Sequence, residues 1–411
     1  MKILFLNPYY KPEIISSTHL GEDLRSALAA AGHTMELYTP YPTRGISDEV
    51  RKEYIQHHRT ETELDGKLAV HRFPLYREGR NPLSRALRYS ILELKHLWFA
   101  LRAKDIDLWP VSSTPPINGL VAVLVNKIRK IPFVYTVQDM FPESMVSTGL
   151  TKEGSLLYKI GSWVSNVTYK NADHIIVISH SIKNALVQKG VPEEKISVIY
   201  NWIDTEATLP VAREDNELFD ELGLDRDKFY LTYAGNLGNS QNVDILLACA
   251  EALKDKEDVR FIIFGGGSEK EKFEKKIADS GLTNIALYPL QTMEKISQVY
   301  SLGDASFVTC KKGVGAGAFP SKAATILSTA TPIIASFDLD SDLCRILTDA
   351  EAGLCADAED VQGAVDAILT LYNDRDKATA MGLNARRLAC DRFSKEVGTA
   401  AKVALFQKFD N

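Results

Sequence analysis

The sequence of 411 residues lacks any long hydrophobic run: nowhere do about 18 apolar residues follow one another, as a membrane-spanning helix requires. Hydrophobic residues make up 45% and charged residues 25% of the chain, and the mean hydropathy is −0.12. These values indicate an ordinary globular protein, not a disordered or membrane-embedded one. An Asn and a Pro interrupt the opening MKILFLNPYY, and no small-residue cleavage site follows, so we expect a first β-strand there instead of a signal peptide.

Cysteine is also scarce, and its five copies are widely spaced without any Cys-x-x-Cys pair. This pattern argues against a zinc or redox site and favours reduced thiols in the cytoplasm. The eight histidines form no cluster with metal-ligand spacing, and we expect His174 and His180 to pack or cap. We therefore expect neither a metal nor a cofactor. No Gly-x-Gly-x-x-Gly follows the first expected strand, which disfavours a Rossmann dehydrogenase.

Charge is unevenly distributed along the chain. Residues 1–200 contain 25 Lys and Arg against 20 Asp and Glu, whereas residues 201–411 contain 23 against 34. A basic half beside an acidic half favours contact of one half with an anionic surface. The length exceeds what a single hydrophobic core usually serves, so two domains are expected.

Short apolar runs alternate with helical patterns in residues 1–204, where we expect the first domain. ILFLN predicts a strand. In the roughly 15 residues after the loop that follows it, leucines and alanines recur at helical spacing, and TMELYT then predicts a second strand. The polar stretch 205–228 predicts a linker, and the alternation then restarts in a second domain over 229–390. We expect a C-terminal helix in 391–411 that packs back toward the first domain. The predicted fold class is α/β, with two doubly wound Rossmann-like domains and a cleft between them.

Seven motifs follow one another along nearly the whole chain: NPYYKPE (7–13), VQDMFPES (137–144), VISHSIKNAL (177–186), VIYNWID (198–204), YAGNLG (233–238), FGGGSE (264–269) and FPSKAATILSTATPIIAS (319–336). In this order and spacing they resemble glycosyltransferase family 4, and within it the WbuB-like group of N-acetyl-L-fucosaminyltransferases and relatives that build O-antigen and capsule. The resemblance implies a GT-B fold, a nucleotide-diphosphate sugar donor held by the second domain and an acceptor held by the first. It also implies retention of the anomeric configuration without a required metal, with UDP as the expected nucleotide.

The sequence departs from that family at one motif, because the usual Glu, seven residues, Glu pattern is absent. Thr325 stands where the second Glu is expected and Gly317 where the first is. The triplet from Pro320 to Lys322 is what the WbuB-like group carries here, and Ala330 replaces a usual glycine. The resemblance implies that these Glu residues hold the ribose and the donor sugar, so other groups must make those contacts in this chain.

Two glycine-rich turns are the candidate donor site. Gly235, Asn236 and Gly238 follow an expected strand and precede an expected helix, so their backbone and the helix N-terminus suit a diphosphate. A turn of this kind also occurs without any ligand. The residues Gly265, Gly266 and Gly267 form a similar turn, which the resemblance places near the nucleotide base; a plain tight turn is the alternative.

Three lysines near the next glycine-rich loop could bind an anion. Lys311 and Lys312 follow a buried strand, and we expect Lys311 to contact the diphosphate more closely, because neighbouring side chains of an extended segment point apart. Pro320 and Ser321 precede a helix that Ser321 could cap. Lys322 lies in its first turn, where the helix dipole disfavours a cation, so an anionic partner is expected. The alternative is a solvated lysine pair.

Asp139 and Glu143 follow the expected strand PFVYTV and are the candidate catalytic residues. At the carboxyl edge of the sheet, a carboxylate could accept a hydrogen bond from a substrate hydroxyl; capping of the next segment is the alternative. A glycosidase-like acid and nucleophile pair is not assumed.

The stretch 80–104 combines leucines and Trp98 near one helical face with basic residues that include Arg85 and Arg88. A basic amphipathic helix with tryptophan can lie in a membrane interface, although a core helix with snorkelling charges fits too. The resemblance implies a polyprenyl-diphosphate-linked saccharide acceptor. We therefore expect a peripheral protein at the inner face of the cytoplasmic membrane, with no nucleic-acid partner. The alternatives are a GT-B-like sugar-nucleotide epimerase and a non-catalytic partner protein that keeps the fold.

Overall fold

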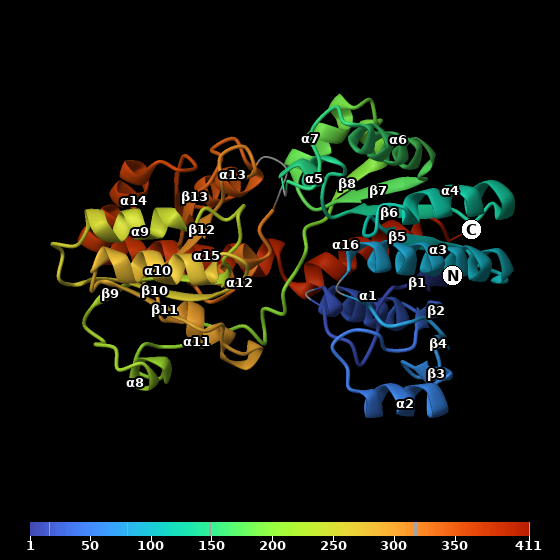
Figure 1. Ribbon diagram of the computed structural model, residues 1–411, viewed down its shortest axis with the longest axis horizontal. Helices are drawn as coiled ribbons and strands as arrows, with labels where there is room; N and C mark the ends of the chain where they lie inside the picture. Colours follow the sequence, from blue (N-terminus) through green and yellow to red (C-terminus); the bar gives the residue numbers. More distant parts are fainter. Residues whose placement is uncertain (16, 80, 148, 316–318, 411) are drawn as a thin grey trace. The chain divides into compact units, whose positions relative to one another are not determined.

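In the computed structural model, the chain forms two compact units (Figure 1). The structure describes residues 1–15, 17–79, 81–147, 149–315 and 319–410. The first unit contains residues 1–178, 183–199 and 398–411. The second contains residues 179–182 and 200–397. Two residues of the sequence predictions lie outside the described residues: Arg80, which begins the basic amphipathic stretch 80–104, and Gly317, which stands where the first Glu of the family pattern is expected.

The first unit is built on a largely parallel sheet with helices along it. Its strands are β1 (Lys2–Leu6), β2 (Thr34–Pro40), β3 (Thr60–Glu63), β4 (Leu68–Phe73), β5 (Trp109–Ser112), β6 (Phe133–Val137), β7 (His174–Val177) and β8 (Ile196–Val198). Its helices are α1 (Thr18–Ala30), α2 (Asp48–His57), α3 (Pro82–Arg102), α4 (Asn118–Arg129), α5 (Glu143–Ser147), α6 (Leu156–Asn171) and α7 (His180–Gln188). The strand orders are β1-β2-β4-β3 and β5-β6-β7-β8, and the two sets meet where the Leu4 N–H donates to the Leu108 carbonyl at 3.0 Å. Only β3 runs antiparallel.

Helix α3 confirms the helix expected within 80–104, but its buried face combines the apolar Leu92 and Ala100 with polar side chains. Arg88 is fully buried, and Glu93 and His96 are nearly so, whereas Leu94 and Trp98 are more than half exposed. The Nη2 atom of Arg88 donates to Thr43 Oγ1 at 2.7 Å. The prediction that Arg88 contacts a membrane is therefore wrong, because periodicity locates an apolar stripe without showing whether that stripe faces the sheet.

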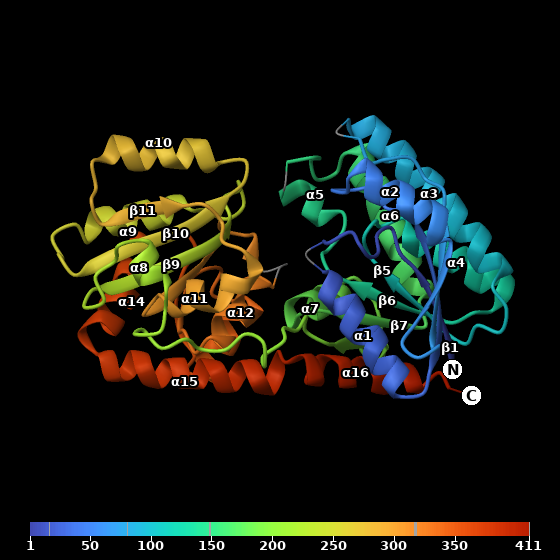
Figure 2. The same cartoon turned by 90° about the horizontal axis from the view of Figure 1, so that it is seen from below.

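The second unit is a six-stranded parallel sheet with helices on both faces (Figure 2). Its strands are β9 (Phe229–Asn236), β10 (Val259–Gly266), β11 (Ile285–Tyr288), β12 (Ala305–Thr309), β13 (Ile333–Ser336) and β14 (Gly353–Ala356), in the order β11-β10-β9-β12-β13-β14. Its helices are α8 (Leu218–Glu221), α9 (Asp244–Ala252), α10 (Lys270–Ser280), α11 (Ile296–Ser301), α12 (Lys322–Ser328), α13 (Asp342–Asp349), α14 (Val361–Asn373) and α15 (Arg375–Arg392); the chain closes with α16 (Lys395–Gln407). The chain leaves β9 toward β10 on one side and later returns to β12 on the other, so the topological switch point lies between β9 and β12.

Side chains of the central strands alternate between two hydrophobic cores. Tyr230 and Ala234 of β9 belong to one core, whereas Phe229, Leu231 and Tyr233 belong to the other. Successive side chains of a strand point to opposite faces, so both faces of this sheet are covered. This explains why the strands appear in the sequence as continuous apolar runs, and the predicted doubly wound α/β fold is confirmed.

Residues 205–228, which we predicted as a linker, are part of the second unit. Leu218 and Phe219 of α8 are fully buried in one of its cores. The correction has a simple cause: a segment rich in Asp and Glu can still be anchored when a few apolar side chains find a core.

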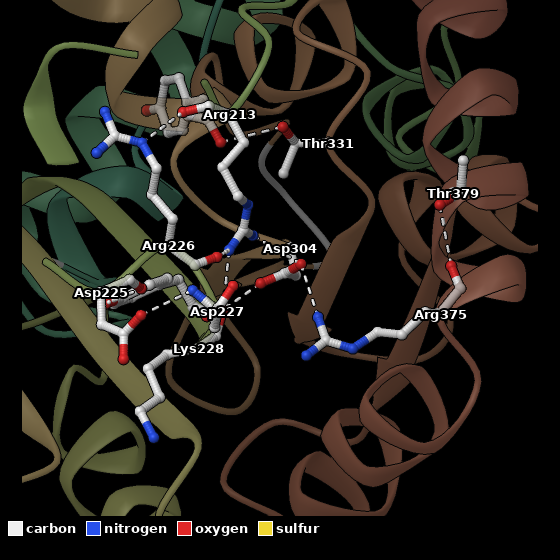
Figure 3. A network of polar contacts seen from close by, with 11 residues as sticks. Arg213, Asp225, Arg226, Asp227, Lys228, Asp304, Thr331, Arg375 and Thr379 are labelled. Atoms are coloured by element: carbon white, nitrogen blue, oxygen red, sulfur yellow. Dashed lines mark hydrogen bonds and ion pairs between the residues drawn. The ribbon is translucent and has the colours of Figure 1, made fainter. Parts of the chain in front are cut away.

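An ion-pair network holds this segment at the amino end of the sheet (Figure 3). Arg213 pairs with Asp304 at 2.8 Å and donates to two backbone carbonyls of the segment 226–228. Asp304 also pairs with Arg375 at 2.8 Å and accepts the Tyr230 N–H at the start of β9. One carboxylate therefore joins three separate segments, at the edge of the sheet opposite the glycine-rich turns.

Ala330, where the resembled family usually has glycine, has a positive φ of 54°. An L-residue in the left-handed region pays a steric cost that glycine avoids. We expect Ala330→Gly to raise the free energy of unfolding by about 1 kcal/mol, measured by urea denaturation. Ala323→Gly, inside α12, is the control and should lower it by a similar amount. A loss of stability in Ala330→Gly would show that the alanine methyl group makes contacts worth more than the backbone strain.

Candidate functional site

The first glycine-rich turn lies at the carboxyl end of β9, which ends at Asn236. Gly235 has a φ of 142°, so only glycine adopts this backbone without strain. The Tyr233 hydroxyl donates to the Asn236 carbonyl at 2.8 Å and fixes the turn. Gly238 lies so close to the Asn236 and Gln241 amides that a Cβ would come within 2.6 Å of both. The turn is thus tightly packed around its own backbone.

The second turn, at the end of β10, interlocks with the first. The Leu237 N–H donates to the Gly266 carbonyl at 2.7 Å, and the Glu269 N–H donates to the Leu237 carbonyl at 2.9 Å. Gly267 has a φ of 137°, and a Cβ there would come within 2.3 Å of Asn236 Oδ1. A Cβ at Gly265 would meet the Leu237 side chain at 2.5 Å. These glycines are therefore needed for close packing of the two turns.

One premise of the sequence analysis is wrong here. No helix starts directly after Gly238, because α9 begins at Asp244, and a carboxylate in its first turn disfavours an anion. The N–H of Leu237 is also occupied by the Gly266 carbonyl. A diphosphate at this turn would therefore depend less on a helix N-terminus than predicted, and more on cationic side chains.

Lys322 supplies such a cation beside the first turn. Its Nζ atom lies 3.8 Å from the centre of the Tyr233 ring, and a Cβ on Gly235 would come within 3.2 Å of it. The Nζ atom is buried, and none of the described residues forms a hydrogen bond or ion pair with it. Desolvation lowers the pKa of Lys322 to about 7. A buried ammonium without a counter-ion is costly, so this arrangement favours an anionic ligand.

Lys311 and Lys312 differ in their surroundings. The Lys311 N–H donates to the Ser240 carbonyl at 2.9 Å, and its Nζ donates to Asn239 Oδ1 at 2.6 Å. Its charge thus faces a neutral amide in the loop that continues from the first turn. Lys312 instead forms an exposed ion pair with Asp357 at 2.7 Å. Of the two, only Lys311 has a charge without an acidic partner beside it.

The remaining predicted donor residues surround the start of α12. Ser321 precedes Lys322, but its side chain forms no capping hydrogen bond, so the predicted cap is wrong. The Pro320 carbonyl accepts the Ala323 N–H at 3.0 Å. Thr325 lies partly buried within the helix, where its carbonyl accepts the Thr329 N–H.

The sequence analysis missed residues that shape this site. Asp338 accepts the N–H groups of Gly313 and Gly315 at 2.9 and 2.8 Å, and so fixes the loop after Lys311. Tyr233 lies within a motif that we quoted, but only its neighbours were chosen. An aromatic residue just before a glycine turn was the available signal for Tyr233; a carboxylate shortly after the strand β13 was the signal for Asp338.

In the first unit, Asp139 and Glu143 have different environments. Glu143 forms an ion pair with Lys189 at 2.5 Å and accepts a hydrogen bond from the Tyr158 hydroxyl at 3.4 Å. No described residue forms a hydrogen bond or ion pair with Asp139, which is exposed beyond the end of β6, and partial desolvation raises its pKa. Both oxygens of Asp139 are therefore available to a ligand, whereas Glu143 keeps only Oε2, which is buried and makes no hydrogen bond to a described residue.

Among the residues with described positions, no three His, Cys, Asp or Glu side chains gather as a metal site would require. In the same part of the chain, no helix is both long enough and apolar enough to cross a membrane.

The glycine turns and the isolated lysine at the switch point of a doubly wound sheet define a candidate site for a phosphate-bearing ligand. Family comparison gives the class. Residues 21–207 match Glycosyltransferase Family 4, and residues 214–388 match Glycosyl transferases group 1. The chain therefore carries both domains of a glycosyltransferase and belongs to that class.

Individual proteins extend this result. The chain is 26% identical over 383 residues to WcaI of Escherichia coli K12, a glycosyl transferase named for colanic acid biosynthesis, with 90% of this chain and 91% of WcaI covered. Sucrose-phosphate synthase from Thermosynechococcus elongatus has a similar fold, with a TM-score of 0.75 at 17% identity over 99% of this chain and 98% of the other. Anabaena HepE, solved with UDP, gives a TM-score of 0.71 at 18% identity over 99% and 100%. These structures confirm the predicted GT-B fold; the WbuB-like grouping stays a prediction.

Proposed function

We propose that this protein is a retaining glycosyltransferase that moves a hexose-type sugar, with an N-acetylated deoxy sugar as a candidate, from a UDP-linked donor to a lipid-linked saccharide. The product would be an intermediate of a bacterial surface polysaccharide. The observation that carries the proposal is the buried Nζ of Lys322 beside Gly235, with which no described residue forms a hydrogen bond or ion pair, because an anionic diphosphate would compensate its charge.

The chemistry requires a site for the leaving group. In the transfer, the bond between the anomeric carbon and the diphosphate oxygen breaks, and the acceptor hydroxyl oxygen forms a new bond to that carbon on the same face of the sugar, while its proton passes to an oxygen of the departing diphosphate. Negative charge then grows on the diphosphate. Lys322 would reach a phosphate oxygen through a rotamer change of its unbranched side chain, and Lys311 would contribute a second cation. The missing Glu pair leaves these lysines a larger share of donor binding.

Two comparisons support the identity of donor and pathway. HepE was solved with UDP, and its fold covers 99% of this chain. WcaI, with 26% identity, is named for colanic acid biosynthesis. The family resemblance implies a lipid-linked acceptor, so we also propose a peripheral position at the inner face of the cytoplasmic membrane.

A donor screen tests the proposal directly. Purified protein is heated with each of a panel of sugar nucleotides, and a ligand present at 100 times its dissociation constant should stabilise the fold by about 2.7 kcal/mol. The nucleotide that raises the melting temperature is then incubated with a polyprenyl-diphosphate-linked saccharide, and the product is analysed by mass spectrometry. Conversion of the donor to a new sugar nucleotide without acceptor would indicate an epimerase instead.

We expect Asp139→Asn to lower kcat about tenfold with little change in donor affinity, because the amide can no longer accept a hydrogen bond as a charged group does. Glu143→Gln is the matched control. Its carboxylate already pairs with Lys189, so turnover should change less. Steady-state kinetics and UDP titration separate the two effects. Equal turnover in wild type and Asp139→Asn would remove Asp139 from the substrate site.

A further inference from the structure

Three neighbouring helices of the first unit, α3, α4 and α6, form a continuous surface. The Arg129 guanidinium at the end of α4 donates to the carbonyls of Leu101 and Ala103 at the end of α3. On its other side, α4 approaches α6 so closely that a Cβ on Gly119 would come within 2.3 Å of Thr168 Oγ1. The helices α3 and α4 run side by side in Figure 1. A ligand that covers one of these helices would therefore meet the others.

Helix α3 presents an apolar stripe to solvent. Leu87, Leu94 and Trp98 recur at intervals of seven and four residues, and Leu94 is 66% exposed. The same helix buries Arg88 and Glu93 together with Leu92 and Ala100. Its outer face exposes large apolar side chains where a water-facing surface helix would present polar ones, so this face is suited to an apolar environment.

Helices α4 and α6 also expose apolar side chains. On α4, Leu124 and Ile128 are exposed one turn apart. On α6, Ile160 and Trp163 are exposed, and Trp163 is 59% exposed. The buried side of α6 is made of small or polar residues such as Ser165 and Thr168. We call the exposed side of α3, α4 and α6 the three-helix face.

The three helices of this face carry mainly positive charge. The sequences of the three helices contain eight Lys and Arg and one acidic residue, Glu93, which is buried. The exposed basic residues within them are Arg85, Arg102, Lys127, Arg129, Lys159 and Lys170. The bordering loops add Lys104, Lys130 and Lys152, together with the acids Asp105, Asp107, Glu153 and Asp173. Around Trp163, a shallow hollow of about 610 Å³ is lined by Lys159 and Lys170 and by one acid, Glu153.

We infer that the three-helix face docks on an anionic lipid bilayer, with all three helices in contact at once. Apolar stripes with tryptophan would enter the interface, and the surrounding lysines and arginines would meet anionic headgroups. A second copy of the chain is a poorer occupant, because two such faces would bring many like charges together. The inference rests on the peripheral position proposed above and deepens it, since it assigns the contact to a surface of the first unit and extends over α4 and α6 the contact that the sequence predicted for α3 alone.

Vesicle flotation tests the inference with the whole protein. Vesicles of phosphatidylcholine with phosphatidylglycerol are compared with vesicles of phosphatidylcholine alone, at low and high salt. We expect binding to the anionic vesicles only, and release by salt. Trp98→Gln and Trp163→Gln should each weaken partitioning by roughly fivefold to tenfold, and Lys127→Gln and Lys159→Gln by about fivefold each. Met293→Gln, at an exposed position of the second unit, is the control and should bind like wild type.

The α6 variants decide between three helices and one. If Trp163→Gln and Lys159→Gln bind vesicles like the control, the three-helix face is not the docking surface. Sedimentation equilibrium without lipid checks the other occupant: a dimer that the same variants dissociate would overturn the bilayer assignment. UDP titration of each variant should match wild type. A wild-type protein that binds vesicles but no nucleotide would contradict the proposed function and leave this inference standing.

Discussion

Replacement of Lys322 by methionine should weaken UDP binding about 100-fold, because a charge-assisted hydrogen bond to a phosphate contributes about 1.5–3 kcal/mol. Methionine keeps the length and packing of the side chain against the Tyr233 ring but carries no charge. Calorimetric titration with UDP measures the loss. Uridine, which has no phosphate, should bind the variant almost as it binds wild type.

The same variant should be more stable than wild type. In the free protein no described residue forms an ion pair with the buried ammonium, so its removal should raise the free energy of unfolding by about 1–3 kcal/mol at neutral pH. Stability and affinity therefore move in opposite directions, which a merely structural lysine would not produce. A variant that is both less stable and weaker in binding would show that Lys322 supports the fold instead of the ligand.

Two further lysine variants locate the phosphate within the site. Lys311→Ala should weaken UDP less than Lys322→Met does, because the Lys311 ammonium already donates to Asn239. Lys312→Ala should have little effect, since Asp357 pairs with that side chain. A larger loss at Lys312 than at either other lysine, or equal losses for UDP and uridine, would place the diphosphate elsewhere.

UDP affinity should fall about 50-fold between pH 7 and pH 9, because Lys322 of the free protein loses its proton near pH 7. A bound diphosphate favours the charged form and raises this pKa, so binding above pH 7 must be accompanied by proton uptake. The phosphate itself is fully ionised in this range, since its last pKa is about 6. Titrations in two buffers of different ionisation enthalpy measure the protons taken up.

Lys322→Arg provides the control for the pH profile, because a guanidinium stays protonated throughout. Its UDP affinity should be nearly constant from pH 7 to pH 9. Parallel profiles for this variant and wild type would show that another group titrates.

In the free wild-type protein the lowered pKa of Lys322 also affects stability. The unfolded chain keeps a proton that the folded chain releases, so the contribution of Lys322 to stability rises from pH 7 toward 10.5.

The sequence predicts the fold well because buried parallel strands leave continuous apolar runs, as the strands β9 and β10 do. It also locates Gly235 and Gly267, since a backbone with positive φ selects glycine. It cannot show that no described residue forms an ion pair with the Lys322 ammonium, because this depends on which side chains several segments, distant in the sequence, place around it.

Which face of a helix is buried is the other property that the sequence left undetermined. The spacing of leucines in α3 predicts a helix, yet the residues that face the sheet include Arg88 and exclude Leu94. The prediction that a helix begins directly after Gly238 is wrong for a related reason. The loop between Leu237 and Asp244 is short and polar, and a loop of this composition does not mark the residue at which a helix begins.

The ion pairs of Asp304 limit where the second unit can be cut when this chain is recombined with its relatives. A fragment cut at 229–390, the boundary that the sequence suggests, would lose Arg213 and leave Asp304 with one arginine instead of two. It would also lose Leu218 and Phe219 and open a cavity in the core. The smallest exchangeable module therefore has to begin near residue 200, so that a chimera inherits the acidic segment together with the sheet that anchors it.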